Sequence, residues 1–69
     1  MNMDYDYKNL VVTLRNKLIM TQEEFADYLG VSFASVNRWE KGHFKPTTKV
    51  KKKIINLCKE NNIRLTIGD

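Results

Sequence analysis

The sequence predicts an all-α domain of four to five short helices, and its C-terminal end could form a short strand. Two observations lead to this prediction. Apolar residues recur three or four positions apart over most of the chain, which is the spacing of residues on one face of a helix. Helix-capping residues also stand before several of these stretches, and Gly30 and Gly42 follow two of them. With 69 residues, we expect one domain spanning 1–69.

The first two helices have distinct sequence signals. We expect the first to begin near Asp6, with an apolar face made of Tyr7, Leu10, Val11, Leu14 and Leu18. Thr21 and Glu24 form a capping box, in which the hydroxyl and the carboxylate each accept a hydrogen bond from the other residue's backbone N–H. This pair predicts the start of the second helix. Gly30 is expected to end that helix in the left-handed αL conformation.

The third helix follows after a very short connection. Ser32 is a favourable N-cap, Val36 and Trp39 are the apolar positions, and Gly42 ends a helix of about nine residues. Only Gly30, Val31 and Ser32 separate the second and third helices, so the chain must turn sharply between them. This is the geometry of a helix-turn-helix.

The C-terminal third contains a fourth helix and a segment of different character. After Pro46, either Thr47 or Thr48 can cap a helix that ends near Asn61-Asn62, and its apolar positions are Val50, Ile54, Leu57 and Cys58. In residues 63–67, apolar and polar residues then alternate with a period of two, as in a strand. An isolated strand is unstable. This segment therefore pairs with another strand, for example in a second copy of the chain, docks on the helices, or frays.

The charges are unevenly distributed. Residues 1–30 contain three basic and five acidic side chains, whereas residues 38–53 contain seven basic side chains and one acidic one. The net charge of the chain is +4. A basic block of this kind is expected in a protein that binds a polyanion. The alternative is a solvated lysine-rich surface that keeps the protein in solution.

The composition argues against several other classes of protein. A chain this short leaves little room for an enclosed catalytic cleft, and it has no paired cysteines and no Gly-rich phosphate loop. Cys58 is the single cysteine and has no recognised zinc spacing with His43. We therefore expect no enzyme activity, no cofactor and no metal site. No apolar run approaches the roughly 18 residues of a membrane span, and no signal-peptide pattern opens the chain. We expect a cytoplasmic, nucleoid-associated protein.

A longer motif runs through the two central helices. It consists of Thr21-Gln22-Glu23-Glu24-Phe25-Ala26, Leu29-Gly30-Val31-Ser32, Val36, Trp39-Glu40, Gly42 and Pro46. This combination resembles the phage repressor and Cro (XRE) family of helix-turn-helix domains over residues 10–58, which leaves 63–69 as a C-terminal extension. The resemblance implies a lambda-repressor-like fold. It also implies sequence-specific binding of duplex DNA by a transcriptional regulator, with the recognition helix (32–41) in the major groove.

The exposed positions of the recognition helix are the candidates for base contacts. They are Phe33, Ala34, Ser35, Asn37 and Arg38. Asn37 suits adenine and Arg38 suits guanine, but Asn37 is also consistent with a solvated side chain and Arg38 with a phosphate contact. Phe33 either touches a thymine methyl group or folds back onto the second helix. Since Phe33 and Ala34 offer no side-chain hydrogen bond, we expect readout to depend on Asn37, Arg38 and DNA shape.

A second group of residues is expected to contact the DNA backbone. Its members are Gln22, Ser32, Lys41, His43, Lys45 and Lys49. The resemblance implies that Gln22 contacts a phosphate and supports the recognition helix, whereas Ser32 is first of all a helix cap. Glu40 is expected to be structural, pairing with an arginine on the base-reading side or capping the loop, because phosphate would repel its carboxylate.

One position departs from the family pattern. Many members have glycine between the first and second helices, where this chain has Ile19. Isoleucine is costly in the αL conformation. We therefore expect this turn to adopt another conformation.

The expected partner is double-stranded DNA, bound by a monomer or by a homodimer on two half-sites. Three alternatives share the same fold. The protein could be an antitoxin paired with a toxin, or a component associated with restriction and modification enzymes. It could also be a protein-interaction adaptor that no longer reads DNA, for which Phe33 and the apolar residues of 63–67 are the supporting features.

Overall fold

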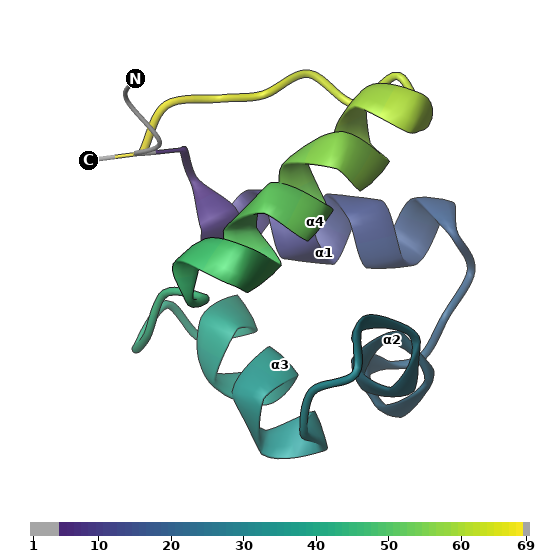
Figure 1. Cartoon of the computed structure of the whole chain (residues 1–69), viewed down its shortest axis with the longest axis vertical. Helices are drawn as coiled ribbons and strands as arrows, with labels where there is room; N and C mark the ends of the chain where they lie inside the picture. Colours follow the sequence, from purple (N-terminus) through teal and green to yellow (C-terminus); the bar gives the residue numbers. More distant parts are fainter. Residues whose placement is uncertain (1–4, 69) are drawn as a thin grey trace.

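A computed structural model of the chain describes residues 5–68. Its four helices are α1 (Tyr7–Lys17), α2 (Gln22–Leu29), α3 (Phe33–Glu40) and α4 (Thr48–Glu60) (Figure 1). The prediction of an all-α fold is confirmed, and the described residues contain no fifth helix. Residues 1–4 and 69 lie outside the described part, so both ends of the domain predicted over 1–69 fall there.

The helix ends follow the local sequence signals. Asp6 caps α1 by accepting a hydrogen bond from the Asn9 backbone N–H (3.2 Å). Both hydrogen bonds of the predicted capping box at the start of α2 are present. Gly30 ends α2 with φ +74°, which is the αL conformation expected of it. Thr47 precedes α4, but its side chain makes no capping hydrogen bond.

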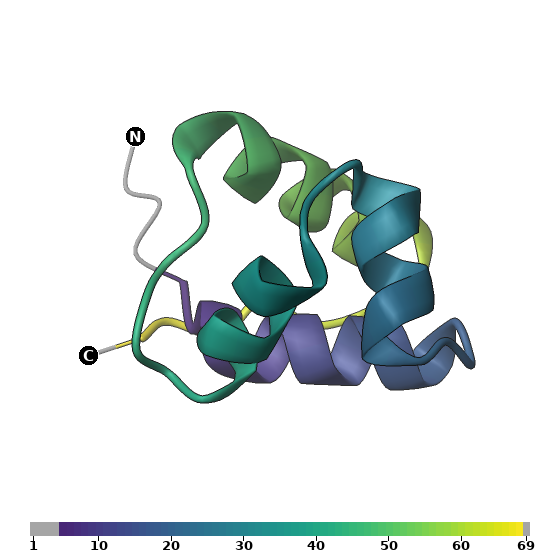
Figure 2. The ribbon, with the colours of Figure 1, turned by 90° about the horizontal axis from the view of Figure 1, so that it is seen from below.

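The core lies where the four helices meet. Figure 2 shows α2 beside the C-terminal end of α1 and α3 nearer its N-terminal end. Helix α4 lies across the core from α1. The predicted core positions Val36, Trp39, Ile54 and Cys58 are confirmed, since each is at most 6% exposed. Together with them, α1 and α2 bury Tyr7, Leu10, Val11, Leu14, Phe25, Ala26 and Leu29.

The prediction for the turn between α1 and α2 is wrong. Ile19 has φ +56°, in the αL region that we expected isoleucine to avoid. In this conformation the Met20 N–H donates to the carbonyl oxygen of Arg15 (3.1 Å), which closes the end of α1. The Ile19 side chain is 90% exposed, so nothing crowds it, although its own backbone remains strained.

The C-terminal segment runs back to the start of α1 (Figure 1). Tyr5 and Ile67 form an isolated antiparallel bridge, and the Asp6 N–H donates to the carbonyl oxygen of Thr66 (2.8 Å). Ile63 and Leu65 pack against the core. Of the alternatives for this segment, the structure therefore shows docking on the helices and pairing with the chain's own N-terminal residues.

Candidate nucleic-acid interface

The start of α3 presents small and apolar groups to solvent. The Ser32 hydroxyl accepts a hydrogen bond from the Ser35 N–H (3.1 Å) and lies 2.9 Å from the Ser35 hydroxyl, so both hydroxyls are engaged within the cap. Phe33 and Ala34 are exposed, and Phe33 is 52% exposed. Half of the Phe33 side chain thus remains available to a ligand of α3.

A hydrogen-bonded network joins α3 to α1 and α2. Arg15 in α1 donates through Nε and Nη2 to the two carboxylate oxygens of Glu40 in α3 (2.7 and 3.0 Å). Gln22, the first residue of α2, donates from Nε2 to Glu40 Oε1 (2.9 Å). The Oε1 atom of Gln22 accepts from Asn37 Nδ2 (3.1 Å). The four side chains fix the position of α3 relative to the other two helices.

The ionisation of Glu40 follows from its partners. Burial by itself would raise the pKa of Glu40, but the hydrogen bonds from Arg15 and Gln22, together with the charge of Arg15, outweigh burial and hold the pKa below its ordinary value. The hydrogen bond to Glu40 in turn raises the pKa of Arg15. Both residues are therefore charged at neutral pH. Glu40 is structural, as expected, but its arginine partner comes from α1 rather than from the base-reading side.

The network also limits what Gln22 and Asn37 can do. Both ends of the Gln22 amide are bound inside the protein, so its position supports α3 directly. Asn37 uses one N–H on Gln22 and keeps its Oδ1 and a second N–H, which are the two groups that a bidentate contact to adenine requires.

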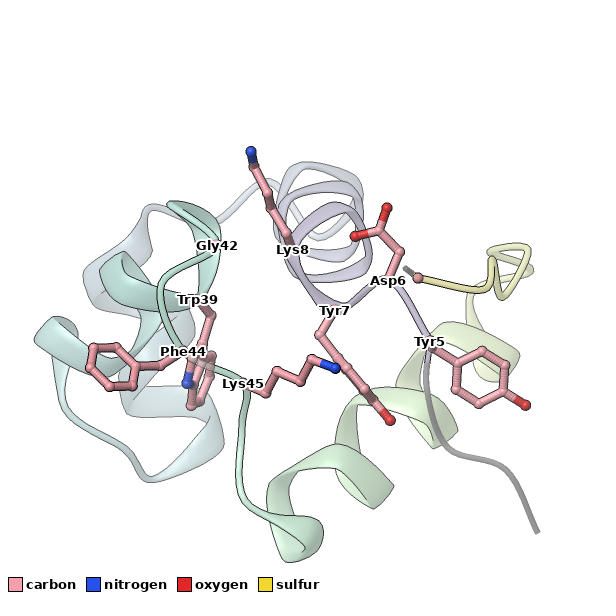
Figure 3. Close-up of a pocket in the computed structure, with 9 residues that line it drawn as sticks. Tyr5, Asp6, Tyr7, Lys8, Trp39, Gly42, Phe44 and Lys45 are labelled. Carbon is pink, nitrogen blue, oxygen red and sulfur yellow. The ribbon is translucent and has the colours of Figure 1, made fainter.

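The turn after α3 gathers exposed basic residues. Lys41 follows the helix, and His43, Lys45 and Lys49 come after it, all with exposed side chains. Gly42 has φ +79°, and a Cβ at this position would lie 3.3 Å from Cδ of Lys8. The turn therefore packs closely against the start of α1. Lys8 and Lys45 both line a hollow of about 190 Å³ beside this contact, together with Trp39 and Tyr7 (Figure 3).

Not every lysine of the basic block is available for a partner. The ammonium group of Lys51 lies 5.2 Å from the ring centre of Tyr7, and Lys53 Nζ donates to the carbonyl oxygen of Leu29 (3.4 Å). These two side chains stabilise the fold. Exposed basic side chains remain both in the turn beside α3 and on α4, where Lys49 and Lys52 are exposed.

Comparison with known proteins agrees with this geometry. Residues 12–61 match the helix-turn-helix family that contains the XRE and Cro-type domains. The chain belongs to this helix-turn-helix family. The resemblance seen in the sequence is thereby confirmed, and DNA is the ligand that the family binds.

One curated relative is similar to part of the chain. It is the type II methyltransferase M.SsoII of Shigella sonnei, which is 43% identical over 55 residues. The matched region covers 71% of this chain but only 14% of the methyltransferase. No solved structure matches the chain. None of the helices within residues 5–68 is long and apolar enough to cross a membrane.

The site of this helix-turn-helix protein contains three residues whose roles were not predicted from the sequence. The guanidinium of Arg38 lies over the ring of Phe44, 5.4 Å from its centre, and no role was predicted for Phe44. The role of Arg15 in holding Glu40 was not predicted. Lys8 was not among the candidates either. Phe44 could have been identified from its position in the sequence, because it is an aromatic residue in a loop of exposed basic residues.

Proposed function

We propose that this helix-turn-helix protein binds duplex DNA in a sequence-specific manner and regulates transcription, with α3 in the major groove. The observation that supports this most directly is the network of Arg15, Glu40, Gln22 and Asn37, which holds α3 rigidly while its outer face stays exposed. A fixed helix about 10–12 Å wide fits the major groove, where each base pair presents its own pattern of donors and acceptors.

The residues divide into two roles in this proposal. Arg38 and Asn37 read bases through hydrogen bonds, Phe33 and Ala34 contact a thymine methyl group, and Ser35 stays within the cap or bonds a base. Phosphates are held by the exposed side chains of Lys41, His43, Lys45 and Lys49. The side chains of Gln22 and Ser32 are engaged within the protein, so these two residues contribute through the backbone at the N-terminal ends of α2 and α3.

The experiment that tests this function is a binding-site selection from random duplex DNA, followed by anisotropy titrations of the selected site at several salt concentrations. We expect one motif to be enriched. If about five basic side chains neutralise phosphates, log K should fall with log salt with a slope of about −4.5 per protomer. Two half-sites with centres about one helical turn apart would indicate a homodimer. No enriched motif, together with a slope near zero, would contradict the proposal.

A second candidate function rests on the similarity to M.SsoII, which is a methyltransferase by name. In this candidate, the chain is the DNA-binding component that accompanies a modification enzyme. The selected motif provides the test, because it can be searched for in the source genome. Occurrence upstream of a methyltransferase gene supports this candidate, and occurrence only upstream of unrelated genes contradicts it.

A further inference from the structure

Phe44 is a large aromatic residue that the core does not explain. It is 59% exposed, and in the view of Figure 3 its ring points away from Tyr7. Removing this much apolar surface from water would normally be favourable. Exposure alone does not distinguish Phe44 from other exposed apolar residues, but the guanidinium of Arg38 over its ring does.

The backbone keeps the Phe44 ring close to the end of α3. The Gly42 N–H donates to the carbonyl oxygen of Trp39 (3.0 Å), and the His43 N–H donates to that of Arg38 (3.1 Å). With φ +79° at Gly42, these bonds fold the turn back over the last turn of α3. Phe44 follows directly, so the backbone brings this residue close to Arg38 on the last turn of α3.

The contact between Phe44 and Arg38 has the geometry of a cation–π interaction. The guanidinium carbon lies 5.4 Å from the ring centre, within the limit of about 6 Å at which the ring attracts a cation. A planar guanidinium that lies over a ring keeps its N–H groups free at its edge. Arg38 can therefore rest on Phe44 and still donate two hydrogen bonds to the O6 and N7 atoms of a guanine.

We propose that Phe44 is a specificity-determining positioning residue, which holds the Arg38 guanidinium in the orientation that reads one base pair. This inference rests on the proposed function. Phe44 itself touches no base. Its ring restricts the arginine before DNA arrives, so less side-chain freedom is lost when the base contact forms.

The test measures discrimination at single base pairs. Dissociation constants are determined for the selected duplex and for duplexes with one changed base pair, using the wild type, Phe44→Leu, Phe44→Tyr, Arg38→Ala and the double variant. We expect Phe44→Leu to lose about two- to fivefold of the discrimination at the base pair that Arg38→Ala affects, as an exposed cation–π contact allows. Phe44→Tyr, which keeps a ring, should retain it. In the double variant, the Phe44→Leu change should have no further effect.

Two controls separate this effect from damage to the fold or to general affinity. Tyr28 is another exposed aromatic residue (54%), and Tyr28→Leu should leave discrimination unchanged. Circular dichroism should give the same helix content for all variants, and the salt slope of Phe44→Leu should equal that of the wild type because no charge is lost.

The outcomes distinguish this inference from the proposed function. If the wild type discriminates among duplexes and Phe44→Leu discriminates equally well, the inference is overturned and the proposed function stands. The inference is also overturned if Phe44→Leu reduces discrimination equally in the presence and absence of the Arg38 side chain. It is overturned as well if Phe44→Tyr loses the discrimination that the wild type shows. If the wild type shows no preference among duplexes, the proposed function fails, and the inference fails with it.

Discussion

The guanidinium of Arg15 and the carboxylate of Glu40 form a two-point ion pair, with Nε 2.7 Å from Oε2 and Nη2 3.0 Å from Oε1. The side chains are 18% and 8% exposed, so the pair is largely withdrawn from solvent. A bidentate pair fixes orientation as well as distance. Arg15 also donates from Nη1 to the carbonyl oxygen of Met20 (3.1 Å), so the same side chain links α3, the end of α1 and the following turn.

Glu40→Gln should destabilise the protein by about 1–3 kcal/mol. The change removes the charge that Arg15 faces in a partly buried place and leaves a charged donor without its full complement of acceptors. The measurement is the free energy of unfolding in urea. Glu60→Gln, at an exposed carboxylate at the end of α4, is the matched control and should change it by less than about 0.5 kcal/mol. Equal effects of the two variants would contradict a structural role for the ion pair.

The pH dependence of stability should reveal Glu40. Its pKa is lowered in the folded protein, so below the ordinary value of 4.5 the unfolded chain takes up the proton first. The contribution of Glu40 is therefore fully present above pH 4.5 and lost as the pH falls through the lowered folded-state pKa. We expect the difference in unfolding free energy between the wild type and Glu40→Gln to shrink over this acid range. A difference that is constant from neutral pH to pH 3 would disprove the linkage.

The helix ends and the core could be predicted from the sequence because their causes are local. The capping box at Thr21, the αL glycine at Gly30 and the apolar spacing that buries Trp39 depend on residues a few positions apart. The links of Glu40 to Arg15 and Gln22 join residues 25 and 18 positions apart, and the packing of three helices brings them together. No local pattern encodes those links.

The turn after α1 shows a different limit of sequence reasoning. Isoleucine is costly in αL, but the expectation that the chain would avoid this conformation at Ile19 is wrong. The surrounding hydrogen bonds and the packing of α1 and α2 determine this turn, and the strain at one residue is small beside them. The conformational preference of one residue therefore does not determine a turn when core packing already fixes the two helices that the turn connects.

Ile19→Gly should therefore stabilise the protein, by about 1 kcal/mol, because glycine adopts αL without the penalty of a branched side chain. The Ile19 side chain is 90% exposed, so little packing is lost. Thermal unfolding should show a midpoint about 4–8 °C higher. Thr13→Gly, at an exposed position in the middle of α1, is the control and should lower the midpoint, since glycine weakens a helix interior. A lower midpoint for Ile19→Gly would show that the turn is not strained.

Arg38→Ala and Lys45→Ala should weaken DNA binding in different ways, although each removes one exposed positive charge. Arg38 is on α3, so its loss should relax the preference at one base pair, by about 1–3 kcal/mol. Lys45 is in the turn after α3, so its loss should weaken binding to every duplex alike and reduce the salt slope by about one unit. Titrations of the selected duplex and its single-base variants at four salt concentrations separate the two effects. If both variants weaken all duplexes equally and flatten the slope equally, Arg38 holds a phosphate, and base readout must come from Asn37 and from the shape of the DNA.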